Sequence, residues 1–238
     1  MESLKGKNVL IAGATGAIGS ATARLLAASG ANLFLAGRNT EKLEAVALAC
    51  NVPAKACFVL DIAEPDAVLA LKEKYFSSFG HIDILINAAG IGIIKPLETL
   101  TEKDFLQSIH TNLYGAFLLA KAFIPAMKEA KKGLVINIPG VLGKTPMAGA
   151  AAYSASKYGL TGMMQSIREE LKRTEVRITN IFLGGVDSAF WDNIDLRVQR
   201  DKMINAEEAA KAIWFLCQQP VSAVVSEMVL QPFNHQAI

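Results

Sequence analysis

The chain has 238 residues and a formal net charge of +2, from 24 basic and 22 acidic side chains. That length can bury a full core, and the near balance of charge excludes the basic surface that nucleic acids require. The three cysteines and His81, His110 and His235 show no disulfide or metal-ligand spacing, and no apolar run is long enough to span a membrane. We therefore expect a cytoplasmic protein that needs no metal and binds neither nucleic acid nor membrane.

Short apolar segments alternate along the chain with longer segments of helical periodicity. Apolar runs without polar alternation are typical of strands that are covered on both faces. The predicted strands are Asn8–Ala12, Asn32–Ala36, Ala56–Leu60, Ile84–Ile86, Leu134–Ile138, Arg177–Leu183 and Val224–Leu230. The predicted helices include Thr40–Ala49, Glu64–Ser77, Glu102–Ala130 and Ala152–Arg173, with caps at Thr40 and Thr101. This alternation predicts an α/β fold, a Rossmann-like doubly wound parallel sheet, as a single domain over residues 1–238.

A glycine-rich segment, Gly13–Gly19, follows the first predicted strand and opens the first helix. Its spacing is G-x-x-G-x-x-G and not the usual G-x-G-x-x-G, so the spacing alone also fits a plain strand–helix turn. Its position favours nucleotide binding, because a pyrophosphate can approach backbone N–H groups closely where side chains are small.

The second predicted strand is followed by Gly37 and Arg38, near the place where an acidic residue would bind the ribose hydroxyls of NAD. Gly37 cannot do so, whereas the Arg38 guanidinium could pair with a 2′-phosphate, which favours NADP(H) over NAD(H). A solvated arginine at a helix entry is the alternative. Asp61, after the third strand, either accepts a hydrogen bond from the adenine amino group or caps the helix near Glu64.

Tyr153 is followed by Lys157 at a spacing that places both side chains on one face of a helix. A nearby ammonium favours the phenolate and so is expected to lower the pKa of Tyr153 toward the working range. Such a tyrosine can pass a proton to or from a carbonyl oxygen while a hydride moves to or from a nicotinamide. Chance also produces such a pair readily, so it gains meaning only together with the glycine-rich segment.

In this combination, from about Lys5 to about Pro220, the chain resembles the short-chain dehydrogenase/reductase family. The residues that carry the likeness are Gly13–Gly19, Asn87-Ala88-Ala89-Gly90, Asn112, Tyr153-Ser-Ala-Ser-Lys157 and Leu183-Gly184-Gly185-Val186-Asp187-Ser188. The resemblance implies a sheet of about seven strands, an NAD(P)-dependent oxidoreductase that acts on alcohols or carbonyls, and a homodimer or homotetramer.

By position, the resemblance makes Tyr153 the catalytic acid/base and Lys157 the residue that holds the nicotinamide ribose. Asn112 would anchor a water that leads from Lys157 toward solvent. Asn87 and Gly90 would shape the cofactor floor, although Asn87 could instead mainly tie strands together, and Ser188 would meet the carboxamide. The implied cofactor-binding residues are Gly13, Thr15, Gly16, Ala17, Ile18, Gly19, Arg38, Asp61, Ile62, Asn87, Ala88, Gly90, Tyr153, Lys157, Gly184, Val186 and Ser188.

The chain departs from the family pattern at Gly140, thirteen residues before Tyr153, where the family has a catalytic serine. Loss of one hydrogen bond to a developing charge can cost about 10²–10³ in rate. Thr145, Ser154 or the substrate itself could supply the missing contact. Smaller departures are Ala17 for the middle glycine of the loop, Leu183 for a proline and a Met228–Pro232 ending without Asp-Gly-Gly.

Two hypotheses follow from this pattern. The first is an NADP(H)-dependent carbonyl reductase or alcohol dehydrogenase that uses Tyr153, Lys157 and Asn112. The second is an NADP(H)-binding protein with vestigial catalysis that acts as a sensor or partner, and Gly140 is its main support. Under the first hypothesis, Gly140→Ser raises activity if a missing hydroxyl limits the rate, whereas an unchanged or reduced rate means a site rebuilt around glycine.

The segment 188–205 is the expected substrate lid, because in this family such a segment closes over the substrate. Phe190 and Trp191 either contact the substrate, as Gly140 would, or pack the lid down. Arg197 and Arg200 either attract an acidic group or lie on a solvated surface. The Ala-, Ser- and Gly-rich helix around Ala148–Gln165 either associates with a second copy of the chain or packs on its own sheet.

Overall fold

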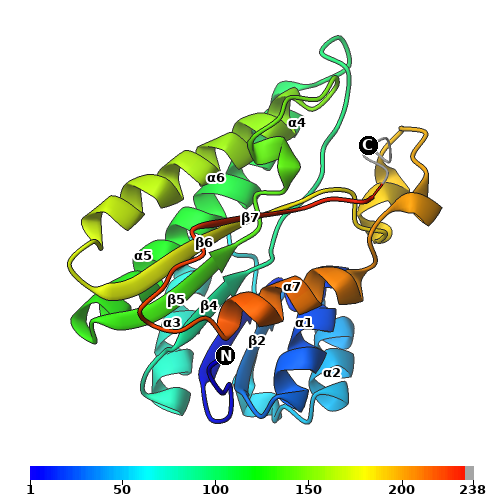
Figure 1. Ribbon diagram of the computed structural model, residues 1–238. Helices are drawn as coiled ribbons and strands as arrows, with labels where there is room; N and C mark the ends of the chain where they lie inside the picture. The colour runs from blue at the N-terminus through cyan, green and yellow to red at the C-terminus, as the bar shows by residue number, and fades with distance from the viewer. Residues whose placement is uncertain (234–238) are drawn as a thin grey trace.

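The computed structural model describes residues 1–233, so His235 lies outside the described part of the chain. The residues form one seven-stranded sheet in which every neighbouring pair of strands is parallel. The strand order is β3-β2-β1-β4-β5-β6-β7, and helices cover both faces (Figure 1). The predicted doubly wound, Rossmann-like sheet is confirmed.

The strands are buried on both faces, as their continuous apolar sequences predict. In β1, Val9 and Ile11 pack on one face of the sheet, while Leu10 and Ala12 pack on the other. The strands are β1 Asn8–Ala12, β2 Asn32–Gly37, β3 Cys57–Val59, β4 Ile84–Asn87, β5 Lys132–Asn137, β6 Glu175–Leu183 and β7 Glu227–Leu230. The two edge strands, β3 and β7, are shorter than predicted because each pairs over only a few residues with a single neighbour.

Two apolar layers hold the helices on the sheet. One layer joins the sheet to α1, α2 and α7, and the other joins it to α3, α5 and α6 (Figure 1). The helices are α1 Ala17–Ala28, α2 Thr40–Ala49, α3 Pro65–Phe79, α4 Glu102–Ile109, α5 Gly115–Glu129, α6 Ala151–Glu170 and α7 Ala206–Cys217. Within residues 1–233, no helix combines the length and the apolar character needed to cross a membrane.

Two local predictions about helices were wrong. The N-cap of α2 is Asn39, whose side chain accepts a hydrogen bond from Lys42 N at 2.8 Å, and Thr40 is already helical. The predicted helix Glu102–Ala130 is divided by a π-helical turn, His110–Tyr114, that brings Thr111 and Asn112 into buried positions. The predicted cap at Thr101 is confirmed, as part of a reciprocal capping box with Asp104.

The strand order reverses between β1 and β4, because the chain crosses to opposite sides of the sheet after these two strands. In such a fold the connecting loops diverge at the carboxyl edge and leave a crevice there. The glycine-rich segment follows β1, and Ala88–Gly92 follows β4, so both segments border this crevice. The fold thus brings together most of the residues singled out from the sequence.

Candidate functional site

Two cavities lie along the carboxyl edge of the sheet, and both are lined by Ala88, Ala89 and Gly90. We call them the nucleotide cavity, of about 260 Å³, and the reaction cavity, of about 150 Å³. The shared wall after β4 makes the two cavities neighbours. An elongated dinucleotide could therefore place one end in each.

The nucleotide cavity is built on the glycine-rich segment. At Gly13, which has a φ of +82°, an added Cβ would lie 2.5 Å from Ala89 N, so only glycine lets the two loops meet. At Gly19 an added Cβ would lie 2.2 Å from Gly13 O, so this glycine lets the loop pack against α1. The lining residues are Gly13, Thr15, Gly16, Gly37, Arg38, Asn39, Lys42, Leu60, Asp61, Ile62, Ala88, Ala89, Gly90 and Thr111.

The far end of the nucleotide cavity carries two cations, Arg38 and Lys42. Arg38 remains more than half exposed, and its Nη1 lies 3.9 Å from Asp61 Oδ2. Asp61 Oδ1 accepts a hydrogen bond from Ala63 N at 2.9 Å, while Glu64 is the N-cap residue of α3. Of the two predictions for Asp61, capping of the helix near Glu64 is therefore wrong. The cations, together with the close approach at Gly13, fit a bound nucleotide, whose phosphates are negatively charged.

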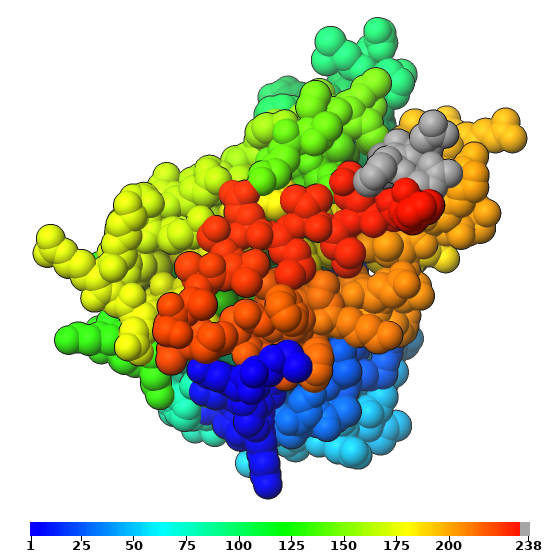
Figure 2. Space-filling view, viewed as in Figure 1, coloured from blue at the N-terminus to red at the C-terminus, as the bar shows by residue number. Residues whose placement is uncertain are grey.

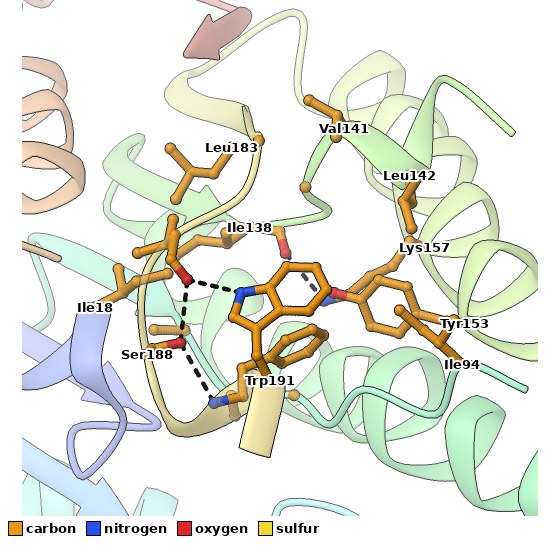
Figure 3. Close-up of a pocket in the computed structure, with 17 residues that line it drawn as sticks. Ile18, Ile94, Ile138, Val141, Leu142, Tyr153, Lys157, Leu183, Ser188 and Trp191 are labelled. Atoms are coloured by element: carbon orange, nitrogen blue, oxygen red, sulfur yellow. Dashed lines mark hydrogen bonds between the residues drawn. The ribbon is translucent and has the colours of Figure 1, made fainter. Parts of the chain in front are cut away.

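The reaction cavity is mostly apolar. Its floor comes from the loops after β4 and β5, and its outer wall comes from the lid (Figure 3). The lining residues are Ile18, Ala88, Ala89, Gly90, Ile94, Ile138, Gly140, Val141, Leu142, Tyr153, Lys157, Leu183, Gly184, Val186, Ser188, Phe190 and Trp191. Of the sequence-predicted site residues, Ala17, Gly19, Asn87 and Asn112 line neither cavity.

Tyr153 and Lys157 point from α6 into the reaction cavity, as their spacing predicts (Figure 3). The Lys157 ammonium lies 5.6 Å from the centre of the Tyr153 ring. Lys157 Nζ donates a hydrogen bond to Ile138 O at 3.0 Å, which fixes the ammonium beneath the cavity. A Cβ added at Gly90 would lie 3.3 Å from this nitrogen, so the loop after β4 closes over the lysine.

Burial shifts the pKa values of both residues. Desolvation of the charged form raises the pKa of Tyr153 above its ordinary value and lowers the pKa of Lys157 to about 8. The expectation that Lys157 lowers the pKa of Tyr153 was therefore wrong for this structure, because burial outweighs the ammonium 5.6 Å from the ring centre. Tyr153 is thus held in its hydroxyl form.

Asn112 lies within the π-helical turn and is almost completely buried. Its amide group donates to Ile91 O and to Ser156 Oγ, each at 3.0 Å, and accepts from Ile91 N at 2.8 Å. Ser156 Oγ in turn donates to Tyr153 O at 2.7 Å. Asn112 therefore ties the loop after β4 to the helical turn that carries Tyr153. That it anchors a water molecule stays a prediction.

Asn87 ends β4 and faces Asn137 across the strand pair. Its side-chain oxygen accepts a hydrogen bond from Ala89 N at 3.3 Å. Because Asn87 holds the start of the loop and lines neither cavity, its geometry fits the structural alternative better than a role in the cofactor floor.

Gly140 lies in the reaction cavity with φ +71° and ψ 170°, a conformation that L-residues rarely adopt. An added Cβ would meet only Leu183 O, at 3.4 Å, so backbone strain and not crowding opposes a side chain here. Neither Thr145 nor Ser154 lines this cavity, so neither supplies the missing hydroxyl. Thr145 lines an adjacent cavity instead, and the Ser154 hydroxyl is buried.

The segment 188–205 contributes Ser188, Phe190 and Trp191 to the wall of the reaction cavity. Its base is closed by a parallel bridge between Val186 and Ile204, and Trp191 Nε1 donates a hydrogen bond to Val186 O at 2.9 Å (Figure 3). The Phe190 ring packs edge-on against Tyr153, with centroids 5.7 Å apart. Both aromatic residues thus line the cavity and also hold the segment down, so the two predictions for them are compatible.

The two arginines of this segment do not face the reaction cavity. Arg200 donates hydrogen bonds to Asp187 at 2.6 Å and to Asp192 at 2.8 Å. Arg197 is exposed and lines neither cavity. The prediction that they attract an acidic group is therefore not supported for Arg200, whose guanidinium is engaged by two carboxylates.

Sequence reasoning missed several lining residues, chiefly Lys42, Ile94, Val141 and Leu142. Lys42 carried a usable signal, because it follows Arg38 by one helical turn at the start of α2. The other three lie in loops or in a short turn, where no periodicity indicates which way a side chain points.

Comparisons with known proteins agree with this geometry. Residues 7–199 match the family model described as short chain dehydrogenase. An uncharacterized oxidoreductase of Staphylococcus epidermidis is 30% identical over 232 residues, covering 98% of this chain and 100% of that protein. A sepiapterin reductase of Chlorobaculum tepidum is 31% identical over 202 residues, covering 84% and 82%.

Solved structures of other proteins share this fold. A metagenomic short-chain oxidoreductase in complex with NADP has 33% identity and a TM-score of 0.83, covering 97% of this chain and 99% of that one. An alcohol dehydrogenase of Thermococcus sibiricus complexed with 5-hydroxy-NADP has 27% identity and a TM-score of 0.87, covering 98% of both chains.

Proposed function

The chain belongs to the short-chain dehydrogenase family of oxidoreductases, and on this premise we propose that it reduces a carbonyl group of a small molecule to a secondary alcohol with NADPH. The observation that carries the proposal is the Tyr153 hydroxyl, which faces the reaction cavity beside a buried Lys157 (Figure 3). In this reaction NADPH supplies a hydride to the carbonyl carbon.

The Tyr153 hydroxyl donates its proton to the carbonyl oxygen as the oxygen becomes negative. Burial raises the pKa of Tyr153, so the hydroxyl keeps its proton across the physiological pH range and can act as the acid in the reduction. Lys157 holds the ribose hydroxyls through Nζ and stabilises the phenolate that remains after proton transfer. Its pKa of about 8 also lets it pass a proton back to Tyr153 near neutral pH.

The preference for NADP(H) over NAD(H) rests on the charges of the nucleotide cavity. Arg38 and Lys42 line the end opposite to Tyr153, and Gly37 leaves no carboxylate at the end of β2. Paired with the exposed Arg38 guanidinium, a 2′-phosphate would gain charge-assisted hydrogen bonds. The two solved relatives named above that contain NADP or a derivative support this choice for similar chains.

The remaining predicted residues serve positioning. Through their hydrogen bonds, Asn112 and Ser156 fix the position of Tyr153 relative to the loop after β4. Ser188 lines the reaction cavity beside Val186 and Gly184, where it can meet the nicotinamide carboxamide. Residues 188–205 act as the substrate lid of one domain that extends over the whole chain.

We further propose that the protein is a homodimer or homotetramer. Phe105, Leu106 and Phe117 of α4 and α5 and Tyr158 of α6 are each at least 40% exposed, which is costly for a face in contact with water. Met164, in contrast, packs inside the chain, so only part of the surface of α6 is available for contact with a second copy. The edge strand β7 runs across the face shown in Figure 2, between α6 and α7, and offers a second contact. Light scattering that gives about the 25.5 kDa of one chain would contradict this.

The cysteines support a reducing, cytoplasmic setting, since Cys50, Cys57 and Cys217 are all free thiols. This part of the proposal is tested by the location of a tagged chain in fractionated cells.

The test of the proposed activity is NADPH oxidation over a panel of ketones, measured together with NADPH binding. We expect turnover of at least one ketone and a weaker affinity for NADH. Tight NADPH binding without turnover of any carbonyl compound would instead favour the second hypothesis, a nucleotide-binding protein with vestigial catalysis, for which Gly140 is the supporting observation.

A further inference from the structure

We propose, resting on the function above, that the substrate is an uncharged ketone held mainly by apolar contacts, with its carbonyl oxygen bonded to Tyr153. The inference concerns the charge class of the molecule that the reaction cavity accepts. It follows from the apolar residues that line this cavity and from the ion pairs that the neighbouring cations make within the chain.

The walls around Tyr153 are apolar. Ile94, Leu142 and Trp191 belong to one buried cluster, with Val141, Phe190 and Tyr153 packed against it. Among residues 1–233, Lys157 is the one charged residue that lines the reaction cavity, and its ammonium is bonded to Ile138 O. An anionic substrate would therefore lose its hydration without gaining a partner, which is a large cost.

Three cations close in sequence to lining residues are paired with carboxylates of the chain itself. Arg200 of the lid binds Asp187 and Asp192. Lys95, next to the lining residue Ile94, binds Asp104 at 2.8 Å. Lys144, in the turn that follows Gly140, binds Glu227 of β7. Each of these cations would have to leave its partner before it could meet an acidic substrate.

The polar side chains that line the cavity are few, and two of them already make hydrogen bonds within the chain. Ser188 accepts a hydrogen bond from Phe190 N at 3.4 Å, and Trp191 Nε1 donates to Val186 O. The Tyr153 hydroxyl faces the cavity, and Gly140 provides no second hydroxyl beside it. One carbonyl oxygen satisfies the Tyr153 hydroxyl, whereas a carboxylate would find no free cation on the walls that residues 1–233 form.

The nucleotide cavity has the opposite character, since Arg38 and Lys42 line it. Negative charge is thus accommodated at one end of the site and apolar surface at the other. The reaction is R–CO–R′ + NADPH + H⁺ → R–CHOH–R′ + NADP⁺, in which the hydride bonds to carbon and Tyr153 protonates oxygen. A proton from solvent then returns to Tyr153 through Lys157.

Methyl benzoylformate and benzoylformate test this directly, because they share the aryl ketone and differ in one charge. We expect kcat/KM of the NADPH-loaded protein to be at least about 100-fold higher for the ester than for the acid. Binding to the NADP⁺ complex is measured separately by Trp191 fluorescence in a Trp214→Phe background. Trp214 lies between α7 and α1, bonded to Ser29, and lines neither cavity.

A matched pair of variants changes the wall charge at Val141, which is only partly buried. Val141→Lys is expected to lower the ester-to-acid ratio by about 10-fold, because the acid gains an ionic partner, while Val141→Met should keep the ratio. An ester that binds without being reduced would support this inference while contradicting the proposed activity. Equal use of the acid, preference for it, binding of neither compound, or the same ratio in both variants would overturn the inference.

Discussion

The Lys157 ammonium lies 5.6 Å from the centre of the Tyr153 ring, and in the reaction cavity the lysine is buried and the tyrosine partly buried. Burial disfavours the charged form of each residue, so the pKa of the tyrosine rises and that of the lysine falls to about 8. The raised pKa keeps the Tyr153 hydroxyl protonated, so it can donate a proton. The lowered pKa of Lys157 lets the lysine gain and lose a proton near neutral pH. Their consequences are measurable.

Replacement of Lys157 by methionine should stabilise the protein near neutral pH. The folded-state pKa of about 8 lies below the unfolded value of 10.5, so the charged lysine opposes folding by about 3 kcal/mol below pH 8. Between pH 8 and pH 10.5 the folded state releases its proton first, and the penalty declines. Urea unfolding at pH 7 and pH 10 should therefore show Lys157→Met as more stable at pH 7, with most of the difference lost at pH 10. A difference that is independent of pH would contradict this.

Substitution of Gly140 by serine should fail to raise activity. Its φ of +71° and ψ of 170° are unfavourable for any side chain, and such a residue costs about 1–3 kcal/mol. Gly140→Ala serves as the control, because it adds the strain without the hydroxyl. We expect both variants to lose similar stability in thermal unfolding and neither to exceed the parent rate. A faster Gly140→Ser with a slower Gly140→Ala would show instead that the hydroxyl is what the site lacks.

Removal of the Arg38 guanidinium should change cofactor preference without changing the chemistry. Charged hydrogen bonds contribute about 1.5–3 kcal/mol, so Arg38→Ala should raise the KM for NADPH roughly 10-fold to 100-fold and leave that for NADH nearly unchanged. Arg173→Ala, at an exposed position beyond α6, is the matched control. Equal losses with both cofactors would place Arg38 outside the 2′-phosphate site.

A methyl group at Gly92 should open the lid. An added Cβ there would lie 2.2 Å from Phe190 Cζ, so the phenyl ring must leave its place beside Tyr153. Overpacking of this kind costs about 1–3 kcal/mol, which corresponds to roughly a 10-fold higher KM for the ketone. Phe190→Ala should remove the clash, so the double variant should resemble Phe190→Ala alone. Additive effects of the two substitutions would contradict the contact.

Much of the fold follows from the sequence because strands and loops leave local signals. Continuous apolar runs mark strands covered on both faces, and the glycines at 13 and 19 are required where backbone meets backbone. The edge strands were predicted too long because the apolar sequence extends beyond the paired residues, at both ends of β3 and at the start of β7. The π-helical turn that contains Asn112 could not be predicted from the sequence, because no local pattern marks it. Asn112 there bonds to Ser156, which lies 44 residues away in the chain.

The site itself was only partly predictable. Spacing places Tyr153 and Lys157 on one face of α6, but it carries no information on burial, and burial decides the direction of both pKa shifts. Likewise the glycine at position 140 suggests a missing hydroxyl, whereas its positive φ shows that the backbone there is also unfavourable for a side chain. The lining residues Ile94 and Leu142 come from irregular segments whose direction is set by tertiary packing.

The most direct test of the proposed function compares the parent protein with Tyr153→Phe, using NADPH and methyl benzoylformate. The substitution removes one oxygen from a side chain whose ring packs against Phe190, so NADPH binding and the melting temperature should be retained. Loss of a general acid is expected to lower kcat/KM by about 10²–10⁴-fold. Such a loss with unchanged NADPH affinity is the result that we predict. A Tyr153→Phe variant that reduces the ketone as fast as the parent would contradict the assignment of Tyr153 as the proton donor.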